Sequence, residues 1–234
     1  MRGIYNKELT QYFTSAIGYI FIAVFLSICG LFFYLTNLAS QNSDIKVFFS
    51  SIITFLMFLI PILTMRSYAE EKKGRTEELL LTAPIELSQI IGGKFLASCT
   101  IFAIPLALTF SFPIIISIFG ECEVLVSLGN YLGLLLIGAT FISIGLFVSI
   151  LSENQIVAAI VTYCILLVLF SLNQVVVMLG DNLISQILNF LSINTHLVKL
   201  TYGVLDLTDL VFFISTTLLF LFLSVLVLDR KRRL

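Results

Sequence analysis

The chain has 234 residues, of which 59% are hydrophobic and only 12% are charged, and its mean hydropathy is +1.10. Soluble domains carry about 25% charged residues, so this composition excludes an ordinary soluble domain and predicts a polytopic membrane protein. The net charge of −1 excludes little, because the distribution of Lys and Arg among the loops matters more than their sum.

The first 15 residues are polar and amphipathic. Their larger apolar side chains recur at helical spacing, and charged residues occupy the rest of the helical wheel. The apolar residues are Ile4, Tyr5, Leu9, Tyr12 and Phe13, and the charged ones are Arg2, Lys7 and Glu8. This pattern predicts a helix that lies in the membrane interface. A frayed terminus is the alternative.

Six apolar runs without a charged residue follow. They cover residues 16–38, 47–65, 95–119, 131–151, 156–178 and 210–228. Each has about the 20 residues that a helix needs to cross a hydrocarbon layer of about 30 Å. The predicted fold class is therefore all-α, a single domain of six transmembrane helices over residues 1–234.

Between the second and third runs lies a strongly charged stretch. Residues 63–95 hold ten of the 27 charged residues (13 Lys and Arg plus 14 Asp and Glu). Because one charge at the centre of a bilayer costs about 3 kcal/mol, we expect all ten to lie in water. Thr76 can cap a helix that ends before Pro84. We therefore predict that 66–94 is a cytoplasmic segment that presents a short docking helix to a partner.

The loops predict the orientation of the chain. With six spans, eleven of the thirteen Lys and Arg residues fall on one side, together with both termini, and only Lys46 and Lys199 fall on the other. The excess of positive charge in cytoplasmic loops therefore predicts that both termini are cytoplasmic.

The later spans carry further signals. Pro105 and Pro113 predict kinks in the third span. Small residues in the fourth span, including Gly138, Gly145 and Ser149, predict a close helix-packing face. Residues 179–209 form the long external connection, whose apolar spacing predicts two short helices, with Thr208 or Asp209 as cap of the last span.

Several chemistries have no support in the sequence. It contains no GxxxxGK[ST] loop for ATP and no HExxH, and His196 is its sole histidine. The spans carry no carboxylate that could relay ions. We therefore expect no catalytic residue, metal site or cofactor site in this chain, and an energy source in a separate ATPase that binds ATP and Mg.

Three stretches resemble a known family. They are LTMRSYAEEKKGRTEELLLTAP followed by IIGGKF, the N-terminal KELTQYFTSAIGYI, and HLVKLTYGVLDLTDLVFF before the last span. Together they resemble ABC-2-type permeases, the membrane subunits of type 2 ABC (ATP-binding cassette) exporters, and most of all the bacterial gliding-motility branch. The resemblance covers almost the whole chain and says little about substrate.

The resemblance implies a permease in the bacterial inner membrane that pairs with a second permease, identical or homologous, and binds two ATPase subunits, with no role in nucleic-acid binding. The implied ATPase contacts are Arg66, Glu70, Glu71, Thr76, Glu77, Glu78, Leu79, Leu80 and Leu81, with a second contact at Ser152, Glu153 and Asn154. The expected function is ATP-driven export. The alternative is a mechanotransmitting subunit that acts on an extracytoplasmic accessory protein without moving a solute.

Overall fold

The structure is a computed structural model that describes residues 1–41, 45–74, 85–119, 124–179, 182–201 and 206–233. These residues form helices and no strand. Six stretches are long and apolar enough to cross a membrane: Ala16–Leu38, Lys46–Lys73, Leu87–Ile118, Val126–Leu151, Gln155–Met178 and Leu207–Arg233. The predicted all-α polytopic fold is therefore confirmed.

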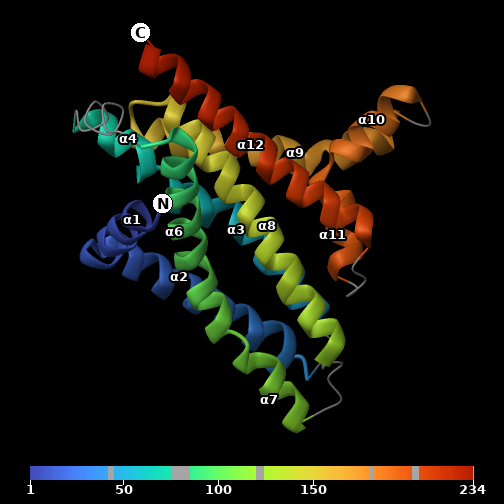
Figure 1. The fold of residues 1–234 in the computed structure, drawn as a ribbon. Coiled ribbons are helices and arrows are strands. Elements are labelled where there is room, and N and C mark those ends of the chain that lie inside the picture. Colours follow the sequence, from blue (N-terminus) through green and yellow to red (C-terminus); the bar gives the residue numbers. More distant parts are fainter. Residues whose placement is uncertain (42–44, 75–84, 120–123, 180–181, 202–205, 234) are drawn as a thin grey trace.

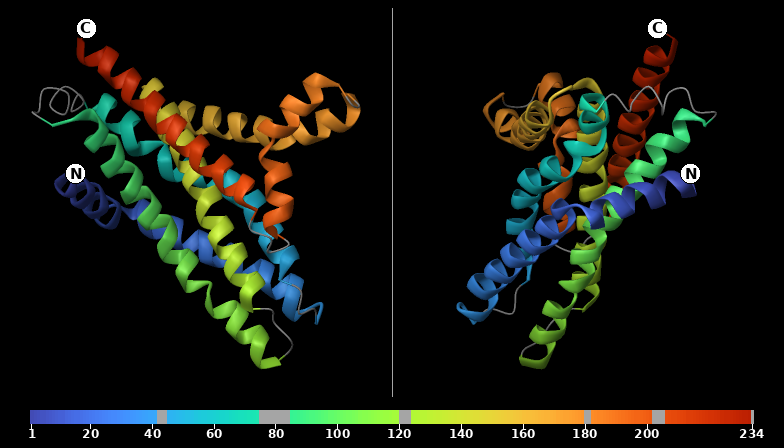
Figure 2. Two further views of the ribbon diagram at one scale, coloured as in Figure 1. Left: turned by 45° about the vertical axis from the view of Figure 1, so that its right-hand side comes forward. Right: turned by 90° about the vertical axis from the view of Figure 1, so that its left-hand side faces the viewer.

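The helices are α1 (Arg2–Thr14), α2 (Ala16–Phe33), the π-helical segment η1 (Tyr34–Leu38), α3 (Lys46–Thr64), α4 (Arg66–Lys73), α6 (Leu87–Leu108), α7 (Ser111–Phe119), α8 (Val124–Leu151), α9 (Gln155–Leu179), α10 (Leu183–Leu191), α11 (Ile193–Thr201) and α12 (Leu207–Arg233). Figures 1 and 2 show that α1, α4 and the C-terminal end of α12 gather at one end of the molecule. The N-terminal end of α12 lies away from that end.

Helix α8 is the centre of the bundle, and its small residues form the close packing face that they predicted. It packs against α3, α6, α9 and α12, and 72% of the residues in its apolar 18-residue stretch are buried. A Cβ atom on Gly138 would lie 2.2 Å from the Phe102 ring of α6, and one on Gly145 would lie 2.1 Å from the Thr64 hydroxyl of α3. A side chain at either position would have to displace its neighbour, so glycine permits this close approach. By contrast, only 17% of the residues in the corresponding stretch of α9 are buried, and the same fraction holds for α12.

The third predicted span is broken, and it starts earlier than expected. Helix α6 begins at Leu87 rather than near Phe95, and the chain bends between α6 and α7. Pro113 has no N–H to bond the carbonyl of Thr109. The Thr109 carbonyl instead accepts the backbone N–H of Phe112 at 2.9 Å and the Tyr131 hydroxyl of α8 at 2.7 Å. The break near Pro113 is thus stabilised by one local contact and by one side chain from another helix.

The connection between α9 and α12 contains the two short helices expected, α10 and α11. The cap of α12, however, is neither Thr208 nor Asp209. Asp206 accepts the backbone N–H of Thr208 at 3.4 Å, and Asp209 turns inward to meet the ring of His196 at 2.6 Å. The sequence prediction failed here because the partner of Asp209 lies in a different helix.

Candidate functional site

Helix α1 is fixed to the protein along one face. Its buried residues, Ile4, Glu8 and Tyr12, are spaced four apart, so they share one side of the helix. This side lies against α6, where a Cβ atom on Gly93 would lie 3.0 Å from Ile4. The predicted amphipathic helix therefore exists, but one of the charged residues assigned to its polar side, Glu8, belongs to the buried face.

Tyr12 joins three elements at the end of α1. Its hydroxyl donates to the Leu63 carbonyl of α3 at 3.2 Å and shares a 3.2 Å hydrogen bond with the Ser98 hydroxyl of α6. Burial raises the pKa of Tyr12 to about 12. The phenol therefore stays protonated at neutral pH and remains a donor to the Leu63 carbonyl.

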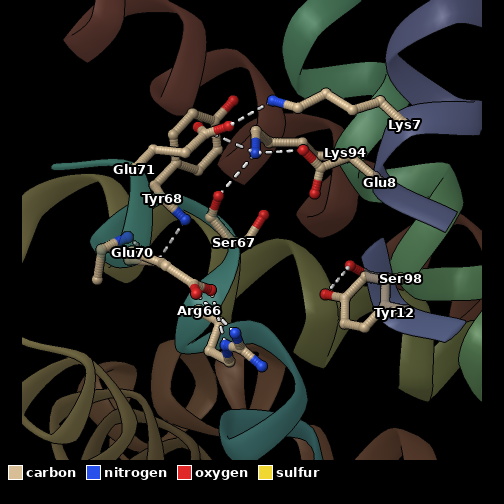
Figure 3. A network of polar contacts seen from close by, with 12 residues as sticks. Lys7, Glu8, Tyr12, Arg66, Ser67, Tyr68, Glu70, Glu71, Lys94 and Ser98 are labelled. Atoms are coloured by element: carbon tan, nitrogen blue, oxygen red, sulfur yellow. Dashed lines mark hydrogen bonds and ion pairs between the residues drawn. The ribbon is translucent and has the colours of Figure 1, made fainter. Parts of the chain in front are cut away.

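The centre of the candidate site is the ammonium group of Lys94, which is 1% exposed. It donates to Oε1 of Glu8 on α1 and to the backbone carbonyl of Ser67 on α4, both at 2.7 Å. Its Nζ also lies 3.0 Å from Oε2 of Glu71 on α4. Lys7 then reaches the other oxygen of Glu71 at 3.2 Å (Figure 3). We call Lys7, Glu8, Glu71 and Lys94 the Lys94 cluster.

The charges of the Lys94 cluster sum to zero. Two ammonium groups face two carboxylates, and the Lys94 Nζ also lies 4.8 Å from the centre of the Tyr68 ring. Such pairing is required because an isolated buried ion would cost several kcal/mol. The expectation that all ten charges of residues 63–95 lie in water is therefore wrong for Lys94 and Glu71. Their compensating partners come from α1, which the local sequence does not reveal.

Two other charged residues of α4, Arg66 and Glu70, pair within the helix. Arg66 donates to Glu70 through Nε at 2.7 Å and through Nη2 at 2.6 Å, a two-point contact one helical turn apart. A small pocket lies beside them, between α1 and α4. It is lined by Glu8, Gln11, Tyr12, Ser15, Arg66, Ser67, Glu70 and Glu71. Thus Arg66, Glu70 and Glu71, which were predicted as ATPase contacts, surround a junction with α1.

The predicted second contact lies at the turn between α8 and α9. Lys72 of α4 approaches Glu153 at 3.9 Å, and the Glu153 side chain is 87% exposed. Asn154 accepts the backbone N–H of Ile156 at 2.9 Å, which helps to start α9. The structure therefore brings the turn close to α4. Thr76, Glu77, Glu78, Leu79, Leu80 and Leu81 lie outside the described residues.

Four residues of this region were missed by sequence reasoning as site residues. Lys7 and Glu8 were treated as a polar face, Lys94 as a solvated charge, and Ser149 as a small packing residue. The spacing of Glu8 with Ile4 and Tyr12 was the signal that could have placed Glu8 on the buried face. Among the described residues, no group of three or more His, Cys, Asp or Glu side chains could hold a metal ion.

Comparison with known proteins identifies the family of the chain. A family model described as "ABC-2 family transporter protein" matches residues 3–232. The chain belongs to the ABC-2 transporter family. It is therefore a multi-pass membrane protein and a component of an ABC transporter. In this family the permease is a separate component from the ATPase. ABC-2 permeases generally work with an ATPase subunit and dimerise. The search among curated proteins found no match, and the gliding-motility branch stays a prediction.

Proposed function

We propose that this ABC-2 protein is the permease subunit of an exporter in the bacterial inner membrane, with two permeases and two ATPase subunits. In this proposal the end that carries α1, α4 and the C-terminus faces the cytoplasm, and the segment after α4 receives the ATPase. The observation that carries the proposal is the Lys94 cluster, because it joins α1, α4 and α6 at the end where a partner would push.

The proposed mechanism follows from this joint. ATP binding closes the ATPase subunits and displaces α4. Because Lys94 holds α4 to α1 and α6 through buried ionic contacts, these three helices move as one unit rather than bending past one another. The movement opens a pathway for a substrate that the sequence does not identify. ATP and Mg remain in the partner, and a matching second permease completes the pathway.

Cysteine labelling tests the orientation. In a variant without the four native cysteines, Lys73→Cys and Ser40→Cys place single thiols at exposed positions, the first in the last turn of α4 and the second just after η1. We expect a membrane-impermeant maleimide to label Ser40→Cys in intact cells and Lys73→Cys only after permeabilisation. Labelling of Lys73→Cys in intact cells would overturn the proposal.

Docking of the ATPase is tested by the double variant Leu80→Asp with Glu78→Arg. Exposed ion pairs contribute only about 0–1 kcal/mol, so we expect apolar residues to dominate the contact and the double variant to lose co-purification with the ATPase. The matched control is Ser40→Asp at the other end. Retained co-purification and stimulated ATP hydrolysis in the double variant would contradict the docking.

Reconstitution separates export from a mechanical role. Flux of a substrate that depends on ATP supports export. ATP hydrolysis that responds only to an extracytoplasmic accessory protein, with no solute moved, supports the mechanotransmitting alternative.

A further inference from the structure

At the junction between α3 and α4, a hydroxyl from another helix forms hydrogen bonds with the backbone. Helix α3 ends at Thr64 and α4 begins at Arg66, so the first amides of α4 need partners from outside the helix. The Ser149 hydroxyl of α8 accepts the backbone N–H of Tyr68 at 3.1 Å and that of Ala69 at 3.2 Å. It also donates to the Met65 carbonyl at 3.2 Å.

These contacts use the full capacity of the Ser149 side chain. A hydroxyl has one donor and two acceptor lone pairs, and all three point to the backbone of the junction. Ser149 is completely buried, so no bulk water can replace a lost contact. Because its partners are backbone atoms, the link holds the path of α4 itself rather than one flexible side chain.

The close approach of α8 to this junction has a second cause. Gly145 lies one helical turn before Ser149 on α8, and its missing side chain is what admits Thr64 at the end of α3. Gly145 and Ser149 therefore share one face of α8, which follows the chain from α3 into α4. A side chain at Gly145 would meet Thr64 at 2.1 Å, so the close approach of α8 to this junction depends on that glycine.

The other contacts of α4 lead to different places. Glu71 and the Ser67 carbonyl tie α4 to α1 and α6 through Lys94. The ion pair of Lys72 with Glu153 does point to the end of α8, but it is 3.9 Å long and its carboxylate is exposed. Ser149 thus provides a buried polar link between α4 and α8, the helix that packs along α12.

We propose that Ser149 is a positioning residue for energy coupling: its hydroxyl, bonded to the backbone at the start of α4, transmits a displacement of α4 to α8. This inference rests on the proposed function, since it takes α4 as the element that the ATPase moves. In this proposal the movement of α4 reaches the rest of the bundle through two sets of contacts. The Lys94 cluster leads to α1 and α6, and Ser149 leads to α8 and onward to α12.

The test compares Ser149→Ala with a matched control in the same helix, Ser143→Ala. Ser143 is also completely buried, but its hydroxyl donates only to the Thr140 carbonyl of its own helix at 2.7 Å. In the purified full-length permease, hydrogen exchange followed by mass spectrometry should show roughly tenfold faster exchange at Tyr68 and Ala69 in Ser149→Ala. Ser143→Ala should leave these amides unchanged. Equal hydrogen-exchange rates at Tyr68 and Ala69 in wild type and Ser149→Ala would disprove the role of Ser149 and would leave the proposed function unaffected.

The second measurement uses the complex with its ATPase, trapped with ATP and vanadate. In Ser149→Ala we expect the ATP-induced change in exchange to shrink severalfold in α8 while it persists in α1 and α6. A merely structural role would reduce all three alike. An intact response of α8, or the same loss in Ser143→Ala, would overturn the proposal. Failure of the proposed function looks different, because wild type itself would then show no ATP-induced change in any helix.

Discussion

The Lys94 cluster and the His196–Asp209 pair are two buried groups of polar side chains that stabilise different parts of the fold. The cluster brings together residues from α1, α4 and α6, and its Lys94 and Glu8 are 86 positions apart in the sequence. The pair joins α11 to the start of α12, and its residues are only 13 positions apart. The first therefore fixes the tertiary arrangement at one end of the bundle, whereas the second fixes one local connection.

The two groups also differ in the kind of partner they use. The cluster balances two ammonium groups with two carboxylates. In the pair, Nδ1 of His196 faces Oδ1 of Asp209 at 2.6 Å and Nε2 faces the Phe190 carbonyl at 3.1 Å. Both ring nitrogens of His196 are therefore engaged, one by a side chain and one by the backbone, whereas the cluster consists of side-chain ion pairs between helices.

The largest effect should come from Lys94→Met, which removes the centre of the cluster. Glu8 and Glu71 would remain buried without their compensating charge, and breaking a buried pair in this way costs about 3–5 kcal/mol. We expect a large fall in thermal stability in detergent, together with loss of protection throughout α1. Lys73→Met, at an exposed position of α4, is the control and should change little. A loss below about 1 kcal/mol for Lys94→Met would show that the cluster does not hold α1 in place.

A smaller, local effect should follow from Asp209→Asn. This substitution replaces a hydrogen bond to a charged group, which is typically worth about 1.5–3 kcal/mol. Faster hydrogen exchange should be confined to α11 and the first turn of α12, with α1 unaffected. Asp229→Asn, on the same helix but in a partly exposed pair with Arg233, is the control. Loosening that reaches α1 would remove the distinction between local and tertiary roles.

His196 is the sole histidine of the chain, so the two contacts of its ring can be followed through one residue. Nuclear magnetic resonance of protein labelled with ¹⁵N-histidine should show both ring nitrogens in hydrogen bonds in wild type. In Asp209→Asn the signal at Nδ1 should change and that at Nε2 should remain. A ring nitrogen that takes part in no hydrogen bond in wild type would contradict the geometry.

The comparison also explains what the sequence could predict. Six spans could be recognised because a run of apolar residues is a local property, and the small residues of α8 correctly marked a packing face. The start of α6 at Leu87 was missed because Lys94 reads as a charge that must leave the membrane. Glu8, Glu71 and the Ser67 carbonyl make Lys94 tolerable in a buried position, and Glu8 lies 86 positions away in the sequence.

The candidate site was likewise predicted only in part. A high local density of charge drew attention to Arg66, Glu70 and Glu71, but it could not distinguish the pair within α4 from the contact to α1. Ser149 carried no signal beyond its small size, because a hydroxyl that bonds the backbone of another helix leaves no pattern in its own neighbourhood. Long-range partners, rather than local propensities, were the missing information.

Tyr12→Phe probes a neutral contact next to the cluster and should cost about 1 kcal/mol, the usual value for one buried hydrogen bond. The control is Tyr19→Phe, because Tyr19 is 59% exposed. The pKa of Tyr12 is raised from 10.0 to about 12 in the folded protein. The unfolded chain therefore gives up this proton first, and wild type should lose stability as pH rises through that range. Tyr12→Phe should lose less stability there, and an equal loss would contradict the burial of the phenol.

The smallest effect should come from Lys7→Ala, at the outer edge of the same cluster. The Lys7 side chain is 55% exposed and touches Glu71 at 3.2 Å, and such solvated pairs contribute about 0–1 kcal/mol. Salt sharpens the comparison, because the Debye length is only about 3 Å at 1 M ionic strength. We expect the effect of Lys7→Ala to vanish at 1 M salt, while that of Lys94→Met persists because its partners are buried. If both variants lost the same stability and responded alike to salt, the four charges would act as a single unit. Side-chain exposure would then not distinguish the residues that hold α1 in place from those that contribute little to its stability.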